Sequence, residues 1–253
     1  MPLLPTVGRT VVLLLALLLT QRAHAQIADS SRPRSAVSGG ISITSKGISV
    51  IPTFTLGKPA AIIDLVVRKQ RLSFEPQFRT GLDAKPWSFL FWGRYQLVQR
   101  EKFHLQVGAH PAVLFRKTST TIGGTAGEYL VARRYLATEV APTYIVSRHA
   151  NVGVYYLYSR ALESDVARNT NFLSARGAVS GIPLGGQFVM RLDPQLYYLA
   201  IDRQHGYYVN GGATIARSRS PFSVSATANK PVDTNIVGGT AFLWNVSLNV
   251  VLR

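Results

Sequence analysis

The sequence predicts an all-β fold: one transmembrane antiparallel up-and-down β-barrel of about 12 strands. First, polar and apolar residues alternate in segment after segment, as in RLSFEPQFRTGL (71–82), which indicates strands with two unlike faces. Second, 47% of the residues are hydrophobic, yet beyond the N-terminus no apolar run reaches the roughly 18 residues that a membrane-spanning helix needs. Third, the expected connections alternate between short and long, as they do in transmembrane barrels.

The N-terminus has the pattern of a secretory signal peptide. Arg9 precedes the apolar stretch VVLLLALLL, and the small-residue motif AHA predicts cleavage between Ala25 and Gln26. The chain has no Cys, so neither a lipid anchor on Cys nor a disulfide is expected. The expected divisions are a signal peptide (1–25), a flexible periplasmic leader (26–39) and an outer-membrane β-barrel (40–253).

Turn signals recur at strand-length intervals from about residue 40 onward. The expected strands are 41–56, 60–67, 71–82, 87–98, 103–116, 129–146, 151–162, 171–183, 187–202, 206–217, 222–229 and 238–252. The alternation in 41–56 changes phase near Gly47, which predicts a bulge there. Residues 60–67 are kept as a strand because an even number puts both chain ends on the periplasmic side.

Connection lengths give the barrel a direction. Short connections are expected at 147–150 and 184–186, and a long one at 117–128. Transmembrane barrels have short periplasmic turns and longer outer loops. The short side is therefore expected to face the periplasm, together with the chain ends.

The net charge of +16 favours polyanionic neighbours. An exported chain does not meet nucleic acid, so the expected partners are outer-membrane lipids, including lipopolysaccharide. No nucleic-acid partner is expected.

Together with the signal sequence and an aromatic-rich last strand, two stretches make the chain resemble Gram-negative outer-membrane β-barrel proteins. These stretches are GISVIPTFTLGKPA (47–60) and LSFEPQFRTGLDAKPWSFLFW (72–92), which look like segments of uncharacterised members of that class. The resemblance implies a location in the outer membrane and a biogenesis partner, the barrel-insertion machinery. No catalytic signature comes with it.

Alternation places many charged side chains on the polar face, which is the lumen if the apolar face meets lipid. These residues are Arg71, Glu75, Arg79, Arg94, Arg116, Arg133, Glu139, Arg176, Arg191 and Asp193, with Asp64 on the same face. Arg outnumbers the carboxylates, which favours an anion-selective pore. The alternative is a network of Arg–carboxylate pairs that fills the barrel. Twelve strands lie between the roughly 8 of filled barrels and the roughly 16 of open ones.

Aromatic residues on the apolar face cluster toward the expected strand ends. They are Trp87, Phe89, Phe103, Tyr129, Tyr156, Tyr158, Phe222, Phe242 and Trp244. Rings at these positions are typical of the girdles at the two membrane interfaces. The rival interpretation is that they form the core of a soluble exported β-sandwich that acts as a binding or adhesion module.

Motifs for catalysis are missing from the sequence. It contains neither G-x-S-x-G nor H-E-x-x-H, and no carboxylate–His cluster suggests a metal. We therefore expect no catalytic residue, no metal and no cofactor. The predicted function is non-enzymatic: either a narrow channel for small, preferably anionic solutes or a filled structural barrel. An outer-membrane lipid hydrolase is the most distant alternative.

Overall fold

The fold is taken from a computed structural model that describes residues 36–252. The expected signal peptide and most of the expected leader lie outside these residues. The strands are β1 (Ala36–Thr44), β2 (Ala60–Lys69), β3 (Leu72–Gly81), β4 (Pro86–Gln99), β5 (Phe103–Ile122), β6 (Thr125–Ser147), β7 (Ala150–Ala161), β8 (Asn169–Gly185), β9 (Phe188–Ile201), β10 (Gln204–Arg217), β11 (Phe222–Thr234) and β12 (Leu243–Leu252).

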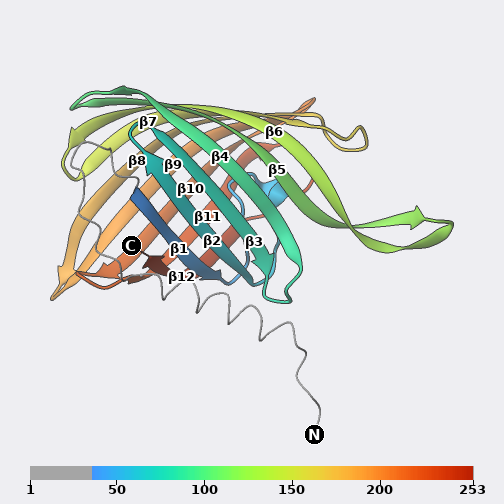
Figure 1. Cartoon of the computed structure of the whole chain (residues 1–253), viewed down its shortest axis with the longest axis horizontal. Coiled ribbons are helices and arrows are strands. Elements are labelled where there is room, and N and C mark those ends of the chain that lie inside the picture. Colours follow the sequence, from blue (N-terminus) through green and yellow to red (C-terminus); the bar gives the residue numbers. More distant parts are fainter. Residues whose placement is uncertain (1–35, 253) are drawn as a thin grey trace, which may run out of the picture. The chain divides into compact units, whose positions relative to one another are not determined.

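These strands form one closed antiparallel barrel in which each strand pairs with its neighbours in the chain (Figure 1). β1 and β12 close the sheet, with Ile41 opposite Val250 and Thr44 opposite Ser247. Closure leaves no free sheet edge, which a barrel in lipid requires. The predicted 12-strand up-and-down barrel is confirmed, and the sandwich alternative is wrong because the strands form one closed sheet rather than two packed ones. Among residues 36–252, no helix is long and apolar enough to span a membrane.

The first expected strand, 41–56, is wrong in its extent. β1 starts earlier, at Ala36, and ends at Thr44. The chain then leaves the barrel wall at residues 45–59, here called the inner segment, which contains one turn of 3-10 helix, η1 (Pro52–Phe54). Gly47 adopts a φ of +53°, and its carbonyl accepts a 2.9 Å hydrogen bond from the Leu56 N–H, which closes the base of the segment. Residues 60–69 then form β2, so the expected second strand is confirmed.

The two rims differ. Turns of two to four residues join the strands on the rim that holds the start of β1 and the end of β12. On the other rim β5 and β6 continue as a long hairpin that projects beyond the barrel (Figure 1). The expected loop 117–128 is thus mostly paired strand, with a turn at Gly123 and Gly124, which both have positive φ.

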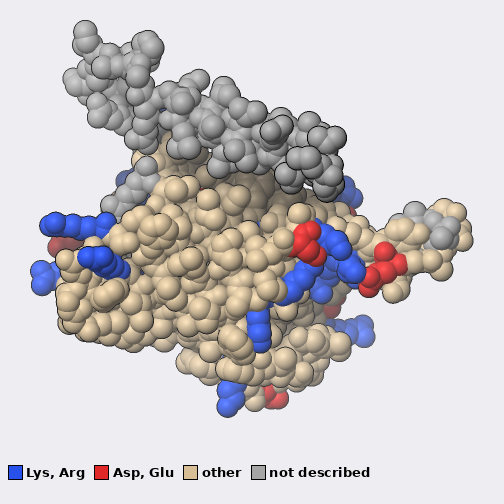
Figure 2. All heavy atoms as spheres, turned by 90° about the horizontal axis from the view of Figure 1, so that it is seen from below, with Lys and Arg blue, Asp and Glu red and all other residues tan. Residues whose placement is uncertain are grey.

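The outer wall is apolar. Leu196 and Phe222 are among the many large apolar side chains that remain more than half exposed there. In the face shown in Figure 2, Lys and Arg gather toward the margins and leave a broad uncharged area between them. An isolated soluble domain rarely exposes so large an apolar surface, whereas a barrel in lipid presents one as a band.

Candidate functional site in the barrel lumen

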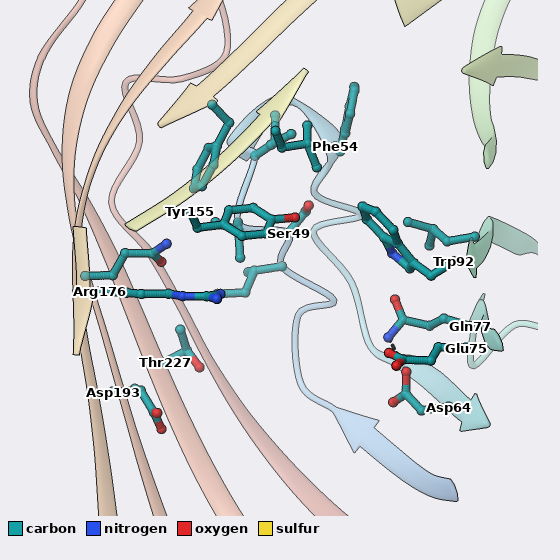
Figure 3. Close-up of a pocket in the computed structure, with 18 of the residues that line it drawn as sticks. Ser49, Phe54, Asp64, Glu75, Gln77, Trp92, Tyr155, Arg176, Asp193 and Thr227 are labelled. Atoms are coloured by element: carbon teal, nitrogen blue, oxygen red, sulfur yellow. Dashed lines mark hydrogen bonds between the residues drawn. The ribbon is translucent and has the colours of Figure 1, made fainter. Parts of the chain in front are cut away.

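The lumen contains a cavity of about 960 Å³, lined by side chains from most of the wall and by the inner segment. Along β7 it reaches from Asn151, close to the short-turn rim, to Ser159, close to the hairpin rim. Figure 3 shows Arg176 and Asp193 on one side of this cavity and Glu75, Gln77 and Asp64 on the other, with the inner segment between the two walls. The inner segment therefore projects into the cavity without filling it.

Glu139 on β6 is the centre of a polar network on the β3–β6 wall. Its side chain has no exposed surface, and its Oε1 accepts a hydrogen bond from Arg94 Nε at 2.6 Å. Tyr155 donates its hydroxyl proton to Glu139 Oε2 at 2.7 Å, and Gln106 donates to Oε1 at 3.0 Å. A buried carboxylate needs this many partners because its desolvation is otherwise unfavourable.

Arg94 joins that carboxylate to a second one. Its Nη1 donates to Glu75 on β3, and Ser73 donates to the other oxygen of Glu75 at 2.6 Å. The guanidinium also lies over the Trp92 ring, 4.2 Å from its centroid, and Trp92 in turn contacts the ring of His110. One guanidinium thus joins two carboxylates, and Arg68 lies 3.9 Å from Glu75 as a second basic partner.

The opposite wall carries Arg groups in different surroundings. Arg191 on β9 makes a bidentate contact with Asp193 on the same strand, with Nη2 2.6 Å from Oδ1. Arg176 on β8 lies over the Tyr155 ring, 4.8 Å from its centroid, and lines the cavity. Among residues 36–252, no carboxylate lies within ion-pair distance of Arg176, nor of Arg79 on β3 of the first wall, which instead donates to Gln77 Oε1 at 2.6 Å.

The inner segment is fixed to the wall at its 3-10 turn. Trp87 on β4 donates its indole N–H to the Phe54 carbonyl at 2.9 Å. The Phe54 ring contacts Tyr135, with centroids 5.4 Å apart. Ile51 packs against a separate apolar cluster on the hairpin side of the lumen.

That cluster contains a row of aromatic rings on the neighbouring strands β8, β9 and β10. Phe172, Tyr197 and Tyr208 follow one another with centroid separations of 4.9 and 4.7 Å, and all three are buried. Ile236, from the connection between β11 and β12, covers them. This cluster therefore occupies part of the lumen toward the hairpin rim.

Seven of the predicted lumen residues do lie on the lumen side: Glu75, Arg79, Arg94, Glu139, Arg176, Arg191 and Asp193. Arg71 does not, because it lies in the turn between β2 and β3. Arg116 and Arg133 share the inward face of their strands but lie nearer the hairpin, where Arg133 pairs with Asp165. With Asp64, the groups around the cavity are four Arg and four carboxylates, so the Arg excess of the inward face comes from Arg116 and Arg133 nearer the hairpin.

Three of the nine predicted girdle aromatics do not lie on the outer face of a strand. A register shift between Arg79 and Thr80 on β3, opposite the start of β4, turns Trp87 inward, and only 1% of Trp87 is exposed. Tyr129 falls on the same face of β6 as Arg133 and Tyr135, which is the inward one. Phe242 lies in the connection before β12. The others are on the outer face: Phe89, Phe103, Tyr156, Tyr158, Phe222 and Trp244.

Sequence reasoning missed Trp92, Tyr155 and Gln77 as functional candidates. Trp92 lies on the same strand face as Arg94, and Gln77 on the same face as Glu75, whereas Tyr155 alternates with Tyr156, which was predicted to face outward. Alternation could therefore have found them, had uncharged residues on the polar face been included.

Neither a protein-family model nor a curated protein sequence matches this chain. Its fold is similar to that of the KdgM porin in complex with disordered oligogalacturonate, with a TM-score of 0.54, 6% identity, and coverage of 85% of this chain and 98% of that one. An outer membrane channel from Pseudomonas putida F1 matches with a TM-score of 0.52 and 12% identity, over 90% of this chain and 99% of the other. The NanC porin matches with a TM-score of 0.50 and 11% identity, over 86% of this chain and 100% of that one. The chain thus has the fold of Gram-negative outer-membrane β-barrel proteins.

Proposed function

We propose that the protein is a non-enzymatic outer-membrane barrel that forms a narrow channel for small solutes. The observation that carries this proposal is the cavity of about 960 Å³, which follows the lumen from one rim toward the other. Its walls carry carboxylates, guanidiniums and amides, groups that bind water. The similar solved structures, two porins and one outer membrane channel, support the same conclusion.

A weak preference for anions is the second part of the proposal. Arg176 and Arg79 lack a carboxylate partner among the described residues, whereas Asp193 and Glu139 are both paired. An unpaired guanidinium in a narrow lumen attracts anions. The preference is expected to be weak because Arg and carboxylate groups balance. An acidic oligosaccharide in the similar KdgM porin supports this choice of solute charge.

The test is the reversal potential of the refolded protein in a planar bilayer with a salt gradient. Arg176→Gln should move the reversal potential toward cation preference. The matched control is Arg219→Gln, which removes the same charge from the β10–β11 turn and should leave selectivity almost unchanged. Equal selectivity in wild type and Arg176→Gln would refute the anion preference while leaving the channel itself in place.

A further inference from the structure

The short-turn rim carries a row of basic side chains, here called the basic arc. It consists of Lys69 and Arg71 at the β2–β3 turn, Arg100 and Lys102 in the β4–β5 turn, and Arg148 in the β6–β7 turn. All five are exposed, and Glu101 is the one acidic residue in these three turns, all of which the structure describes. The arc therefore has a net charge of +4.

The three turns lie side by side, because β2 to β7 follow one another in the barrel wall. The Gln96 N–H of β4 donates to the Arg71 carbonyl at 2.9 Å, and the Ile145 N–H of β6 donates to the Lys102 carbonyl at 2.8 Å. Each turn is thus bonded to the strand that leads into the next turn. The basic groups form one continuous edge on the β2–β7 side of the barrel.

Carboxylates do not neutralise the basic arc. Among residues 36–252, none lies within ion-pair distance of its five basic groups, while the neighbouring Arg68 is 3.9 Å from Glu75 and is not counted in the arc. On the hairpin rim, four basic groups are paired with acidic ones. These pairs are Lys58–Asp83, Lys117–Glu128, Arg133–Asp165 and Arg134–Glu163. The arc therefore keeps its positive charge, which attracts anions.

The basic arc adjoins the part of the wall that faces lipid. Large apolar side chains at the adjoining strand ends are exposed, namely Val67, Leu72, Leu97, Phe103, Tyr144 and Val146. Of the described residues that line the lumen cavity, none belongs to the arc. Basic groups at the edge of an apolar band lie at the height of the lipid headgroups. The anion that meets the arc at this height is a headgroup phosphate.

We propose that the basic arc binds the headgroups of anionic phospholipids in the leaflet at the short-turn rim. Its net positive charge selects an anionic headgroup over a zwitterionic one, and the adjoining apolar wall contacts the acyl chains. The proposal rests on the membrane location given under the proposed function, but it does not depend on conduction through the lumen.

The test is native mass spectrometry of the refolded full chain in detergent. Phosphatidylglycerol is the anionic probe, and phosphatidylcholine with identical chains is the zwitterionic comparison. The wild type should bind phosphatidylglycerol more tightly. The variant Arg71→Gln/Lys102→Gln/Arg148→Gln loses one charge in each turn and should lower that preference about fivefold, the effect of one basic group near a headgroup. Glu101→Gln removes the acidic group and should raise the preference by a similar factor, a gain that misfolding cannot produce.

The matched control is Arg160→Gln/Arg168→Gln/Arg203→Gln, which removes three exposed basic groups from the hairpin rim and gives the same net charge. It should leave the preference nearly unchanged. Equal losses in the two triple variants, or a wild type without a preference, would overturn the proposal.

Two further measurements separate the occupants and the claims. Equally tight binding of glycerophosphoglycerol, the headgroup without acyl chains, would overturn the lipid in favour of a soluble anion. A chain that leaves membranes in a carbonate wash would refute the membrane location together with this proposal. A silent planar bilayer beside an intact preference for phosphatidylglycerol would refute the channel and support the arc.

Discussion

Arg94 and Glu139 form an ion pair across an intervening strand, with Nε and Oε1 2.6 Å apart. Gly108 of β5 lies in register between them, opposite Arg94 on one side and Glu139 on the other. A Cβ at Gly108 would lie 3.0 Å from the Cγ atoms of both residues. The glycine therefore leaves the space through which the two side chains meet, and strand register builds the centre of the lumen network.

Glu139→Gln should destabilise the barrel by about 3 kcal/mol. The change leaves the Arg94 guanidinium with only Glu75 as a carboxylate partner, and breaking a buried pair costs more than the pair contributes. The measurement is urea unfolding of the refolded protein in lipid vesicles. Glu128→Gln is the control, because its pair with Lys117 is more than half exposed and should contribute less than about 1 kcal/mol. Equal losses in the two variants would contradict this account.

Gly108→Ala should destabilise the barrel by about 1 to 3 kcal/mol, because the added methyl pushes Arg94 and Glu139 apart. Gly211→Ala is the matched change on β10, where a Cβ would meet nothing within 4 Å. The same unfolding assay compares them. A Gly108→Ala protein as stable as Gly211→Ala would show that the glycine is not needed for the pair.

Trp87→Phe should loosen the inner segment. The change keeps a ring but removes the N–H that the Phe54 carbonyl accepts, a bond that contributes about 1 kcal/mol. The expected result is larger current fluctuation in single-channel recordings at unchanged mean conductance. Phe103→Leu alters an aromatic residue on the outer face and serves as the control. Fluctuations that match those of the wild type would refute a tethering role for Trp87.

Lowering the pH should weaken the hydrogen bonds that hold the end of the β7–β8 connection to Asp202. The pKa of Asp202 is lowered by hydrogen bonds from the backbone N–H groups of Asn169 and Arg168. A lowered pKa means that this stabilisation is complete above the ordinary Asp pKa and is lost as the pH falls through the lowered value. Hydrogen exchange at Arg168 and Asn169, corrected for its intrinsic pH dependence, should accelerate over that range. In Asp202→Asn the corrected rates should not depend on pH; a similar acceleration there would rule out Asp202 as the cause.

The barrel itself could be predicted from alternation and loop lengths, because both follow from one wall that separates lipid from a polar lumen. Trp87 shows where that reasoning stops. A single register shift beside Thr80 reverses the face of the residues at the start of β4, and nothing in the local pattern marks it.

The inner segment shows a second limit. Ile48, Val50 and Phe54 alternate as in a strand, but their side chains line the lumen rather than face lipid. Periodicity indicates that one face of a segment is apolar, but it does not show what that face contacts. The same limit applies to Arg71 and Arg116. Alternation predicts which face of a strand a residue lies on, but not how far along the barrel axis the residue lies.

The central claim is that the lumen is a continuous water path narrowed by the inner segment. The most direct measurement is single-channel conductance of two refolded proteins, the wild type and a variant without residues 48–55. Gly47 and Leu56 are already hydrogen-bonded at the base of the segment, so the deletion can be closed without moving β1 or β2.

The account predicts steady conductance steps for the wild type and larger ones for the deletion. Folded β-structure by circular dichroism with a silent bilayer for both would contradict it and indicate a filled structural barrel. A silent wild type beside a conducting deletion would also contradict it, because the inner segment would then close the lumen.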